Sequence, residues 1–177
     1  GVQTCALPIF GLMAHMDGTA SHWLVRTAIG SLARLTHRGA IAADGKTGDG
    51  CGLLLKKPDG FLRAIATAEG FALAELYAVG MIFLSREAEV AERARRQLEQ
   101  ELAAEKLELC GWRRVPTDSE ACGAEALKTL PDIWQVFVNA PSEMDEAALE
   151  RRLYIARRRC EKAREPHDPV FYVPSLS

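Results

Sequence analysis

The residues best suited to chemistry lie in one glycine-rich segment, residues 35–52, with the sequence LTHRGAIAADGKTGDGCG. Four glycines fall within residues 39–50, a composition typical of a tight connection or of a backbone that approaches another group closely. Asp44 and Asp49 could form a carboxylate pair for a metal ion or for acid–base chemistry. Each precedes a glycine, however, and an Asp in that place commonly bonds its own following backbone, which favours turns.

The tripeptide Gly45-Lys46-Thr47 resembles the end of a phosphate-binding loop. That motif requires a glycine where Ala40 stands, a strand before the loop and a helix after it. Here a helix is expected before the loop and a strand after it, which argues against a nucleoside-triphosphate site.

Cys51 lies between Gly50 and Gly52. A nucleophilic cysteine requires a lowered pKa from a neighbouring His or a helix N-terminus. The sequence shows neither, so we expect Cys51 to be a small buried residue.

The tripeptide His37-Arg38-Gly39 ends a predicted helix. The helix dipole favours a cation there, and the glycine can adopt the left-handed conformation that caps a helix.

Basic residues crowd one predicted helix near the C-terminus. A nucleic-acid contact is conceivable, but glutamates are interleaved at pairing distances, and Leu149, Leu153 and Ala156 form an apolar stripe. These features predict a solvated, salt-bridged face on a helix that packs against a core. The basic residues are Arg151, Arg152, Arg157, Arg158, Arg159, Lys162 and Arg164, and the glutamates are Glu146, Glu150, Glu161 and Glu165.

The elements that must position these residues alternate along the chain. Apolar runs predict strands at residues 10–16, 51–55, 77–84, 109–115, 133–139 and 170–173. Helical periodicity predicts helices at residues 22–35, capped by Ser21, and at residues 58–68, 87–107 and 143–164. This order alone suggests a parallel α/β sheet.

Composition bounds the class of protein. The chain has 177 residues, 48% of them hydrophobic, with a formal net charge of −2. These values indicate one globular domain or part of one, and they favour neither nucleic acid nor an anionic membrane as a partner. We expect no membrane span and no secretion leader. Five cysteines without metal-ligand spacing indicate reduced thiols in a cytoplasmic protein.

Two long stretches carry a resemblance to a known family. FGLMAHMDG, followed by SHWLVRTAIGSLARLTHRGAIAADGKTGDGCGLLL, resembles the start of the glutamine amidotransferase domain in the large chain of glutamate synthase. The HRG element resembles the wider group of amidotransferases with an N-terminal nucleophile, and ADGKTGDGCG resembles glutamate synthase in particular. The later IARRR and FYVPSLS also resemble this family, so the resemblance extends over residues 10–177.

The resemblance implies a specific chemistry. In this family the N-terminal Cys thiolate attacks the glutamine side-chain amide, and its own α-amino group, with a pKa near ~8, serves as the base. The nucleophile position falls on Pro8, so no catalytic residue is expected in this chain. The family's Asn-Gly oxyanion hole corresponds to no residue here, and we expect the chain by itself to be inactive.

The resemblance also implies which residues support the nucleophile site. His37, Arg38 and Gly39 would lie beside the nucleophile, with Arg38 helping to position the N-terminal strand. Asp49 and Gly50 would head the next strand.

Residues 1–9 (GVQTCALPI) are unlike the family and read like a translated sequencing-library adapter. We therefore expect a non-native segment 1–9, followed by the N-terminal part of the domain at 10–177.

The family's fold is α+β, a four-layer αββα sandwich of the Ntn-hydrolase type with antiparallel sheets, of which this chain would form part. The resemblance therefore replaces the parallel sheet suggested above by antiparallel sheets. It implies no cofactor or metal in this chain. The full-length enzymes use FMN and an iron–sulfur cluster, with NADPH, NADH or ferredoxin as electron source.

Glutamine is the implied substrate, and ammonia released from it reaches 2-oxoglutarate. The implied partners are the rest of the large chain and a small flavoprotein subunit. The alternative is a non-catalytic module of the same fold that binds a small molecule or a partner chain.

Overall fold

The computed structural model describes residues 11–34, 42–48 and 50–177. These residues form two compact units. One unit comprises the described residues up to Lys56 together with Glu120–Lys128, and the other comprises Lys57–Ser119 and Thr129–Ser177. Within these described ranges, no helix is long and apolar enough to cross a membrane.

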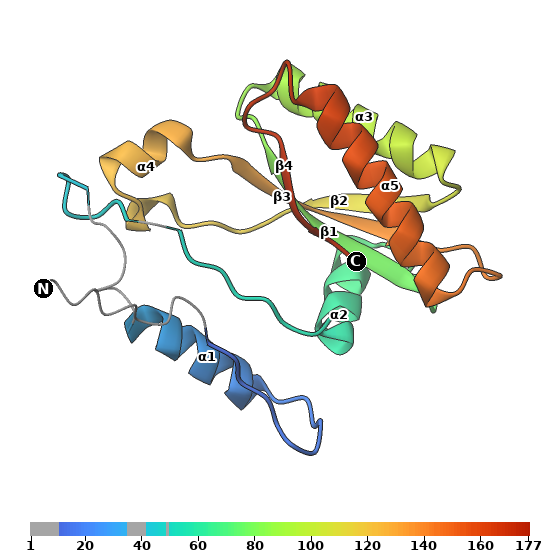
Figure 1. The fold of residues 1–177 in the computed structure, drawn as a ribbon, viewed down its shortest axis with the longest axis horizontal. Coiled ribbons are helices and arrows are strands. Elements are labelled where there is room, and N and C mark those ends of the chain that lie inside the picture. Colours follow the sequence, from blue (N-terminus) through green and yellow to red (C-terminus); the bar gives the residue numbers. More distant parts are fainter. Residues whose placement is uncertain (1–10, 35–41, 49) are drawn as a thin grey trace, which may run out of the picture. The chain divides into compact units, whose positions relative to one another are not determined.

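The second unit is built on a four-stranded sheet in the order β2-β3-β1-β4 (Figure 1). Every neighbouring pair is antiparallel. The antiparallel, α+β expectation is therefore confirmed, and the parallel sheet that element order suggested is wrong. The strands are β1 (Tyr77–Leu84), β2 (Glu108–Arg114), β3 (Asp132–Asn139) and β4 (Tyr172–Leu176).

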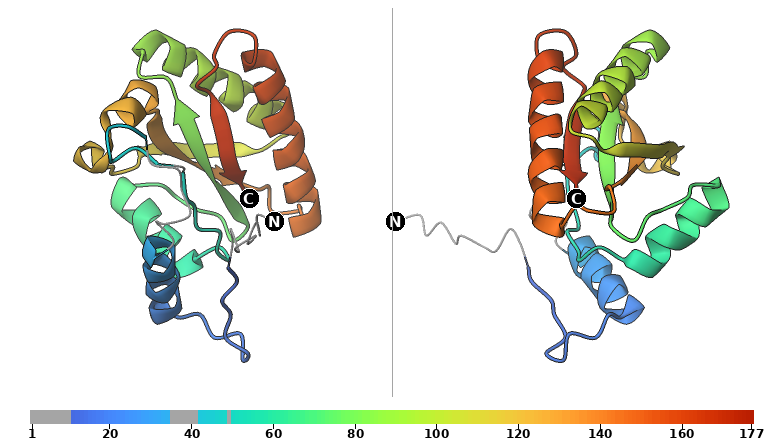
Figure 2. Two further views of the ribbon diagram at one scale, coloured as in Figure 1. Left: turned by 60° about the vertical axis from the view of Figure 1, so that its left-hand side comes forward. Right: turned by 90° about the vertical axis from the view of Figure 1, so that its right-hand side faces the viewer.

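Two long helices cover one face of this sheet, α3 (Ala88–Ala104) and α5 (Glu146–Arg164) (Figure 2). Alternate residues of β1 and β3 point toward them, because successive strand side chains face opposite sides. The apolar stripes expected from helical periodicity are buried in this core. It includes Ile82, Val136 and Val138 from the strands, Ala94, Leu98 and Leu102 from α3, and Leu149, Leu153, Ala156 and Cys160 from α5.

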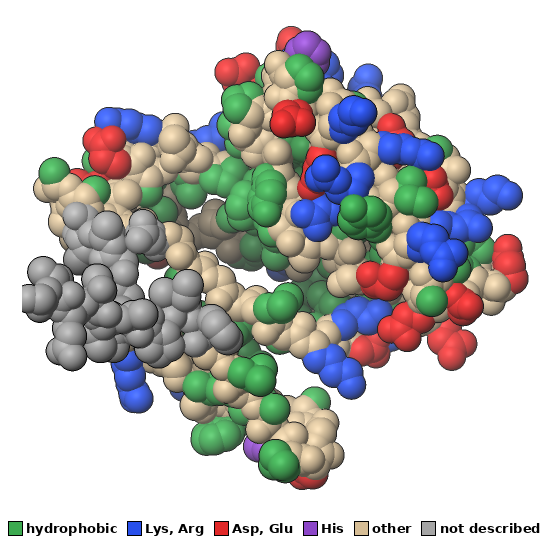
Figure 3. Space-filling model, in the orientation of Figure 1, with side chains coloured by type: hydrophobic (Ala, Val, Ile, Leu, Met, Phe, Trp, Pro, Cys, Tyr) green, Lys and Arg blue, Asp and Glu red, His purple; other side chains and the backbone are tan. Residues whose placement is uncertain are grey.

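The outer side of α5 carries the salt bridges that its sequence predicts. Arg157 and Arg158 both contact the Glu161 carboxylate, at 2.8 and 2.6 Å. Arg159 reaches Glu105 at 2.8 Å. The space-filling view shows basic and acidic side chains interleaved over the region of α3 and α5 (Figure 3). The salt-bridged interpretation of the basic helix is confirmed for the two pairs with Glu161, whereas Glu105, at the end of α3, was not among the expected partners.

The opposite face of the sheet is contacted by Phe71, which follows α2 (Asp59–Glu69). The Phe71 ring lies 5.4 Å from the Phe137 ring. Asn139 anchors the connection to β1, because its side-chain amide donates to the Ala72 carbonyl and its oxygen accepts from the Ala74 N–H. A buried polar side chain thus satisfies two backbone groups of an irregular segment.

The first unit contains α1 (His22–Arg34). Ser21 lies at its N-cap as expected, and its hydroxyl oxygen accepts a 3.4 Å hydrogen bond from the Leu24 N–H. The side chains of α1 are not buried, and Trp23 is 65% exposed.

Two expected strands are absent from the described residues. Residues 11–16 and 51–55 have irregular backbone and are mostly exposed, and Leu54 is 95% exposed. An apolar run becomes a strand only where a neighbouring strand supplies hydrogen-bond partners, and the described part of this unit pairs neither segment as a strand.

The last strand is displaced, and one helix was not expected. β4 begins at Tyr172 rather than at residue 170 because Asp168 Oδ1 accepts from the Val170 and Phe171 N–H groups and holds them in a turn. The short helix α4 (Ala124–Thr129) follows a 3₁₀ turn at Ser119–Ala121. Both lie in the connection between β2 and β3.

Candidate functional site

The described part of the glycine-rich segment forms a closed turn. Asp44 Oδ1 accepts from the N–H groups of Lys46 and Thr47, at 3.0 and 2.8 Å. The Ala42 N–H donates to the Thr47 carbonyl at 2.7 Å, and the Gly45 N–H donates to the Ala42 carbonyl at 3.0 Å. Gly45 has a φ of 69°, which favours glycine. The turn-forming interpretation of Asp44 is confirmed.

The other oxygen of Asp44 bonds outside the turn. Asp44 Oδ2 accepts from the Thr47 hydroxyl at 2.5 Å and from the Glu125 N–H at 3.2 Å. The Thr47 hydroxyl oxygen accepts in turn from the Ala126 N–H at 3.2 Å. The pKa of Asp44 lies well below its usual range. The carboxylate accepts a hydrogen bond from the Thr47 hydroxyl, and further ones from the backbone N–H groups of Thr47, Lys46 and Glu125. Asp44 is therefore an ionised acceptor with both oxygens bonded, which does not suit it to general-base catalysis.

Gly123 makes this contact possible. A Cβ at this position would overlap the Thr47 hydroxyl and the Asp44 carboxylate, so only glycine fits without displacement. The pairing of Gly123 with Asp44 and Thr47 was not predicted from the sequence. A glycine followed by the helix formers of AEALK indicates the start of α4. No residue near Gly123 in the sequence indicates that it packs against Asp44 and Thr47.

Of the residues predicted to support a nucleophile, the structure describes Gly50. It is exposed, and a Cβ on it would meet no atom within 4 Å. Pro8, at the predicted nucleophile position, lies outside the described residues. So do His37, Arg38, Gly39 and Asp49.

Cys51 is exposed, so the expectation that it is buried is wrong. The backbone of residues 51–55 is irregular, and the described residues do not pair it into the strand that was expected to bury the thiol. Lys46 and Thr47 use their backbone N–H groups to bond Asp44, and irregular backbone rather than a helix follows the segment. This geometry agrees with the argument against a phosphate-binding loop.

Among the described residues, no three His, Cys, Asp or Glu side chains gather in a way that could hold a metal ion. Asp44 is bonded to backbone and hydroxyl groups, and its suggested partner Asp49 lies outside the description.

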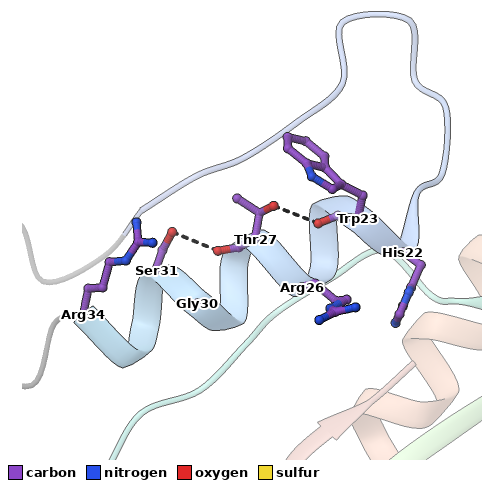
Figure 4. A pocket seen from close by; sticks show the side chains of 7 residues that line it. All are labelled: His22, Trp23, Arg26, Thr27, Gly30, Ser31 and Arg34. Carbon is purple, nitrogen blue, oxygen red and sulfur yellow. Dashed lines mark hydrogen bonds between the residues drawn. The ribbon is translucent and has the colours of Figure 1, made fainter.

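A surface depression of about 480 Å³ lies along α1 (Figure 4). The seven described residues that line it belong to this one helix. The hydroxyls of Thr27 and Ser31 donate to carbonyls one turn earlier, at 2.9 Å each. His22 and Arg26 project from one side of the helix and Trp23 from the other, so these side chains do not converge on a common point.

Comparison with known proteins decides the family. Residues 9–177 match the family model described as glutamine amidotransferases class-II. The chain belongs to this family. The amidotransferase chain is also 35% identical over 168 residues to the glutamate synthase [NADPH] large chain of Bacillus subtilis, and 36% identical over 170 residues to that of Azospirillum brasilense. Each match covers 94% of this chain and 11% of the relative.

A plant relative gives the same result. The amidotransferase chain is 36% identical over 155 residues to ferredoxin-dependent glutamate synthase 1 of Arabidopsis thaliana, a match that covers 86% of this chain and 10% of the relative. The chain thus spans about a tenth of the length of these curated relatives. The predicted resemblance to the glutamate synthase amidotransferase domain is confirmed, and the relatives are enzymes.

Proposed function

We propose that this chain is part of the glutaminase domain of a glutamate synthase, the part that releases ammonia from glutamine so that glutamate can be made from 2-oxoglutarate. One observation carries the proposal: the match to glutamate synthase large chains extends along 94% of the chain at 35% identity. It includes the glycine-rich segment, where the chemistry-bearing residues are concentrated.

The proposed reaction needs an N-terminal cysteine. Its thiolate adds to the glutamine carboxamide carbon, ammonia leaves with the proton that the α-amino group supplies, and water hydrolyses the resulting thioester to glutamate. In this chain Pro8 stands at the nucleophile position, so we propose that the chain as given is inactive. His37, Arg38, Gly39, Asp49 and Gly50 are the proposed supports of the nucleophile.

The boundaries of the domain are part of the proposal. Residues 10–177 are the proposed native amidotransferase sequence, and residues 1–9 are a proposed non-native segment. The family match begins at residue 9, one residue before the proposed native sequence, and leaves residues 1–8 unmatched. Sequencing the encoding genomic DNA tests it, and uninterrupted native coding sequence for residues 1–9 would contradict it.

We assign the cofactors of the whole enzyme, FMN and an iron–sulfur cluster, to sequence other than this chain. The described residues bring no three His, Cys, Asp or Glu side chains together, and an iron–sulfur cluster takes four cysteine thiolates. Partners are the rest of the large chain and a small flavoprotein subunit, with NADPH, NADH or ferredoxin as electron source.

The test is ammonia release from glutamine. Residues 1–9 are replaced by Cys-Gly, so that the sequence begins Cys-Gly-Phe10. The altered sequence is expressed as part of the whole protein that its native gene encodes. We expect equimolar glutamate and ammonia from glutamine, and loss of both when the new Cys is Ser. A folded protein with the Cys restored that releases no ammonia would overturn the proposal.

A second function is favoured by one observation, the proline at the nucleophile position. A module that has lost its nucleophile could bind glutamine or a related amide without hydrolysing it. Calorimetric titration of the unaltered protein with glutamine separates the two functions. Saturable binding by a chain that stays inactive after Cys-Gly is restored would favour the binding module.

A further inference from the structure

Two side chains of the glycine-rich segment hold a segment much further along the chain. Asp44 Oδ2 accepts from the N–H of Glu125, 81 residues away, and Thr47 Oγ1 accepts from the N–H of Ala126, 79 residues away. Both N–H groups lie in the first turn of α4, where a helix has no internal partner for them. We call this arrangement the clasp: Asp44, Thr47, Gly123 and the backbone N–H groups of Glu125 and Ala126.

Thr47 is central to the clasp because its hydroxyl both donates and accepts. It donates to Asp44 Oδ2 at 2.5 Å and accepts from Ala126 at 3.2 Å. The same residue closes the turn through its carbonyl, which accepts from the Ala42 N–H at 2.7 Å. Ala42 and Thr47 are thus held side by side at the base of the turn.

The sequence positions around this base are the ones proposed to support catalysis. Gly39, the end of the HRG element, is three residues before Ala42, and Asp49 is two residues after Thr47. The turn itself, residues 42–47, is closed at its base and bonded from outside by the N–H groups of Glu125 and Ala126. Gly123 permits the close approach, since a Cβ there would overlap both clasp side chains.

We propose that Asp44 and Thr47 are positioning residues of the glutaminase site, which act by clasping α4 and so fixing the turn that joins the HRG element to Asp49-Gly50. This inference rests on the proposed function. In this proposal, Asp44 and Thr47 act by positioning other residues, and they do not contact glutamine. The connection between β2 and β3 contains Gly123 and α4. In this proposal it helps to hold the glutaminase site in place and is more than a surface loop.

The first experiment tests the clasp without any activity. Amide exchange of Glu125 and Ala126 is measured by NMR in the 177-residue chain and in its Thr47→Val variant, which keeps the side-chain shape and removes the hydroxyl. We expect exchange about tenfold faster in the variant, the ratio that corresponds to a lost hydrogen bond. Thr47→Ser retains the hydroxyl and is expected to restore slow exchange.

A matched control makes the same chemical change elsewhere. Thr67 on α2 also donates its hydroxyl within the chain, to the Arg63 carbonyl at 2.9 Å, and it is not part of the clasp. Thr67→Val is expected to leave the Glu125 and Ala126 amides unchanged. If Thr47→Val does not fold, Asp44→Asn provides a second variant, because it removes the charge and one of two carboxylate acceptors.

The second experiment tests the positioning role. The same substitutions are made in the protein with Cys-Gly in place of residues 1–9, expressed within its native reading frame. Ammonia release is normalised to reactive N-terminal cysteines. We expect kcat to fall about tenfold in Thr47→Val with a KM for glutamine within about twofold of the parent, and Thr47→Ser to restore kcat.

The exchange rates test the clasp, kcat tests the positioning role, and ammonia release by the parent protein tests the proposed function. Unchanged exchange at Glu125 and Ala126 in Thr47→Val and Asp44→Asn would overturn the clasp. Faster exchange with unchanged kcat would overturn the positioning role and leave the clasp a structural contact. If the parent protein releases no ammonia, the proposed function fails and the positioning role fails with it, while the exchange data still report on the clasp.

Discussion

The Tyr77 hydroxyl donates a 2.8 Å hydrogen bond to Asp59 Oδ1 and so joins the first residue of β1 to the first residue of α2. Two cations lie over the tyrosine ring, with Lys57 Nζ and Arg63 Cζ each 4.6 Å from its centre. Arg63 also donates to both Asp59 oxygens at 3.1 Å. Tyr77 is 1% exposed, so these contacts anchor α2 to the sheet through one buried ring.

Removal of the Tyr77 hydroxyl should loosen this anchor. Tyr77→Phe is expected to lower the free energy of unfolding by about 1 kcal/mol, the usual cost of one hydrogen bond. The measurement is urea unfolding followed by Trp112 and Trp134 fluorescence, with Trp23 replaced by Phe so that only the second unit reports. Tyr172→Phe, at an exposed position, is the control and should change little.

The same pair predicts a dependence on pH. Burial, followed by the Asp59 hydrogen bond, raises the pKa of Tyr77 to about 12. Above pH 10 the unfolded state therefore loses the phenolic proton before the folded state does, so stability falls as pH rises through this range. The parent chain should lose stability more steeply between pH 10 and 12 than Tyr77→Phe, and equal slopes would contradict the contact.

Gly80 lies where β1 has no room for a side chain. A Cβ there would be 2.7 Å from Leu176 Cδ1, 2.9 Å from Val136 Cγ1 and 3.2 Å from the Ser175 carbonyl oxygen. Gly80→Ala is expected to destabilise the second unit by about 1–3 kcal/mol through overpacking, as measured by urea unfolding. Gly60→Ala, in α2 with nothing within 4 Å of its Cβ, should stabilise it by about 0.5–1 kcal/mol. Equal effects would show that Gly80 is not tightly packed.

The cysteines should differ in reactivity toward thiol reagents. Cys160 is fully buried, and burial, with a further contribution from Glu101, raises its pKa to about 12. Cys51 is exposed. At pH 8 in native buffer, Cys160 should be modified at least about a hundredfold more slowly than Cys51, with sites assigned by mass spectrometry. In urea the two rates should converge, and fast native modification of Cys160 would contradict the packing of α5.

The second unit follows closely from its sequence. The apolar run YAVGMIFL forms β1 over the range expected, and Ala94, Leu98 and Leu102 are buried at the helical spacing that predicts α3. Boundaries moved where a side chain bonds the backbone. Asp145 caps α5 by accepting from the Ala148 N–H at 2.7 Å, which sets its start at Glu146 rather than at residue 143.

The first unit follows its sequence less well, because its signals are not local. The run CGLLL at 51–55 is apolar enough for a strand, yet its backbone is irregular, since strand formation depends on a partner that an apolar run does not specify. The turn at Asp44 was predictable from the Asp-Gly pair. Its bonds to Glu125 and Ala126 were not, because their sequence separation of about eighty residues leaves no periodic trace.

In the proposed function, this chain is part of a glutaminase domain and Pro8 stands at the position of the nucleophile. The most direct measurement is covalent labelling, by a diazoketone analogue of glutamine, of the protein whose residues 1–9 are replaced by Cys-Gly within the native reading frame. We expect one label per chain on the new N-terminal Cys, protection by excess glutamine, and no label when that residue is Ser. A folded protein that takes up no label, or one labelled only at Cys51, would contradict it.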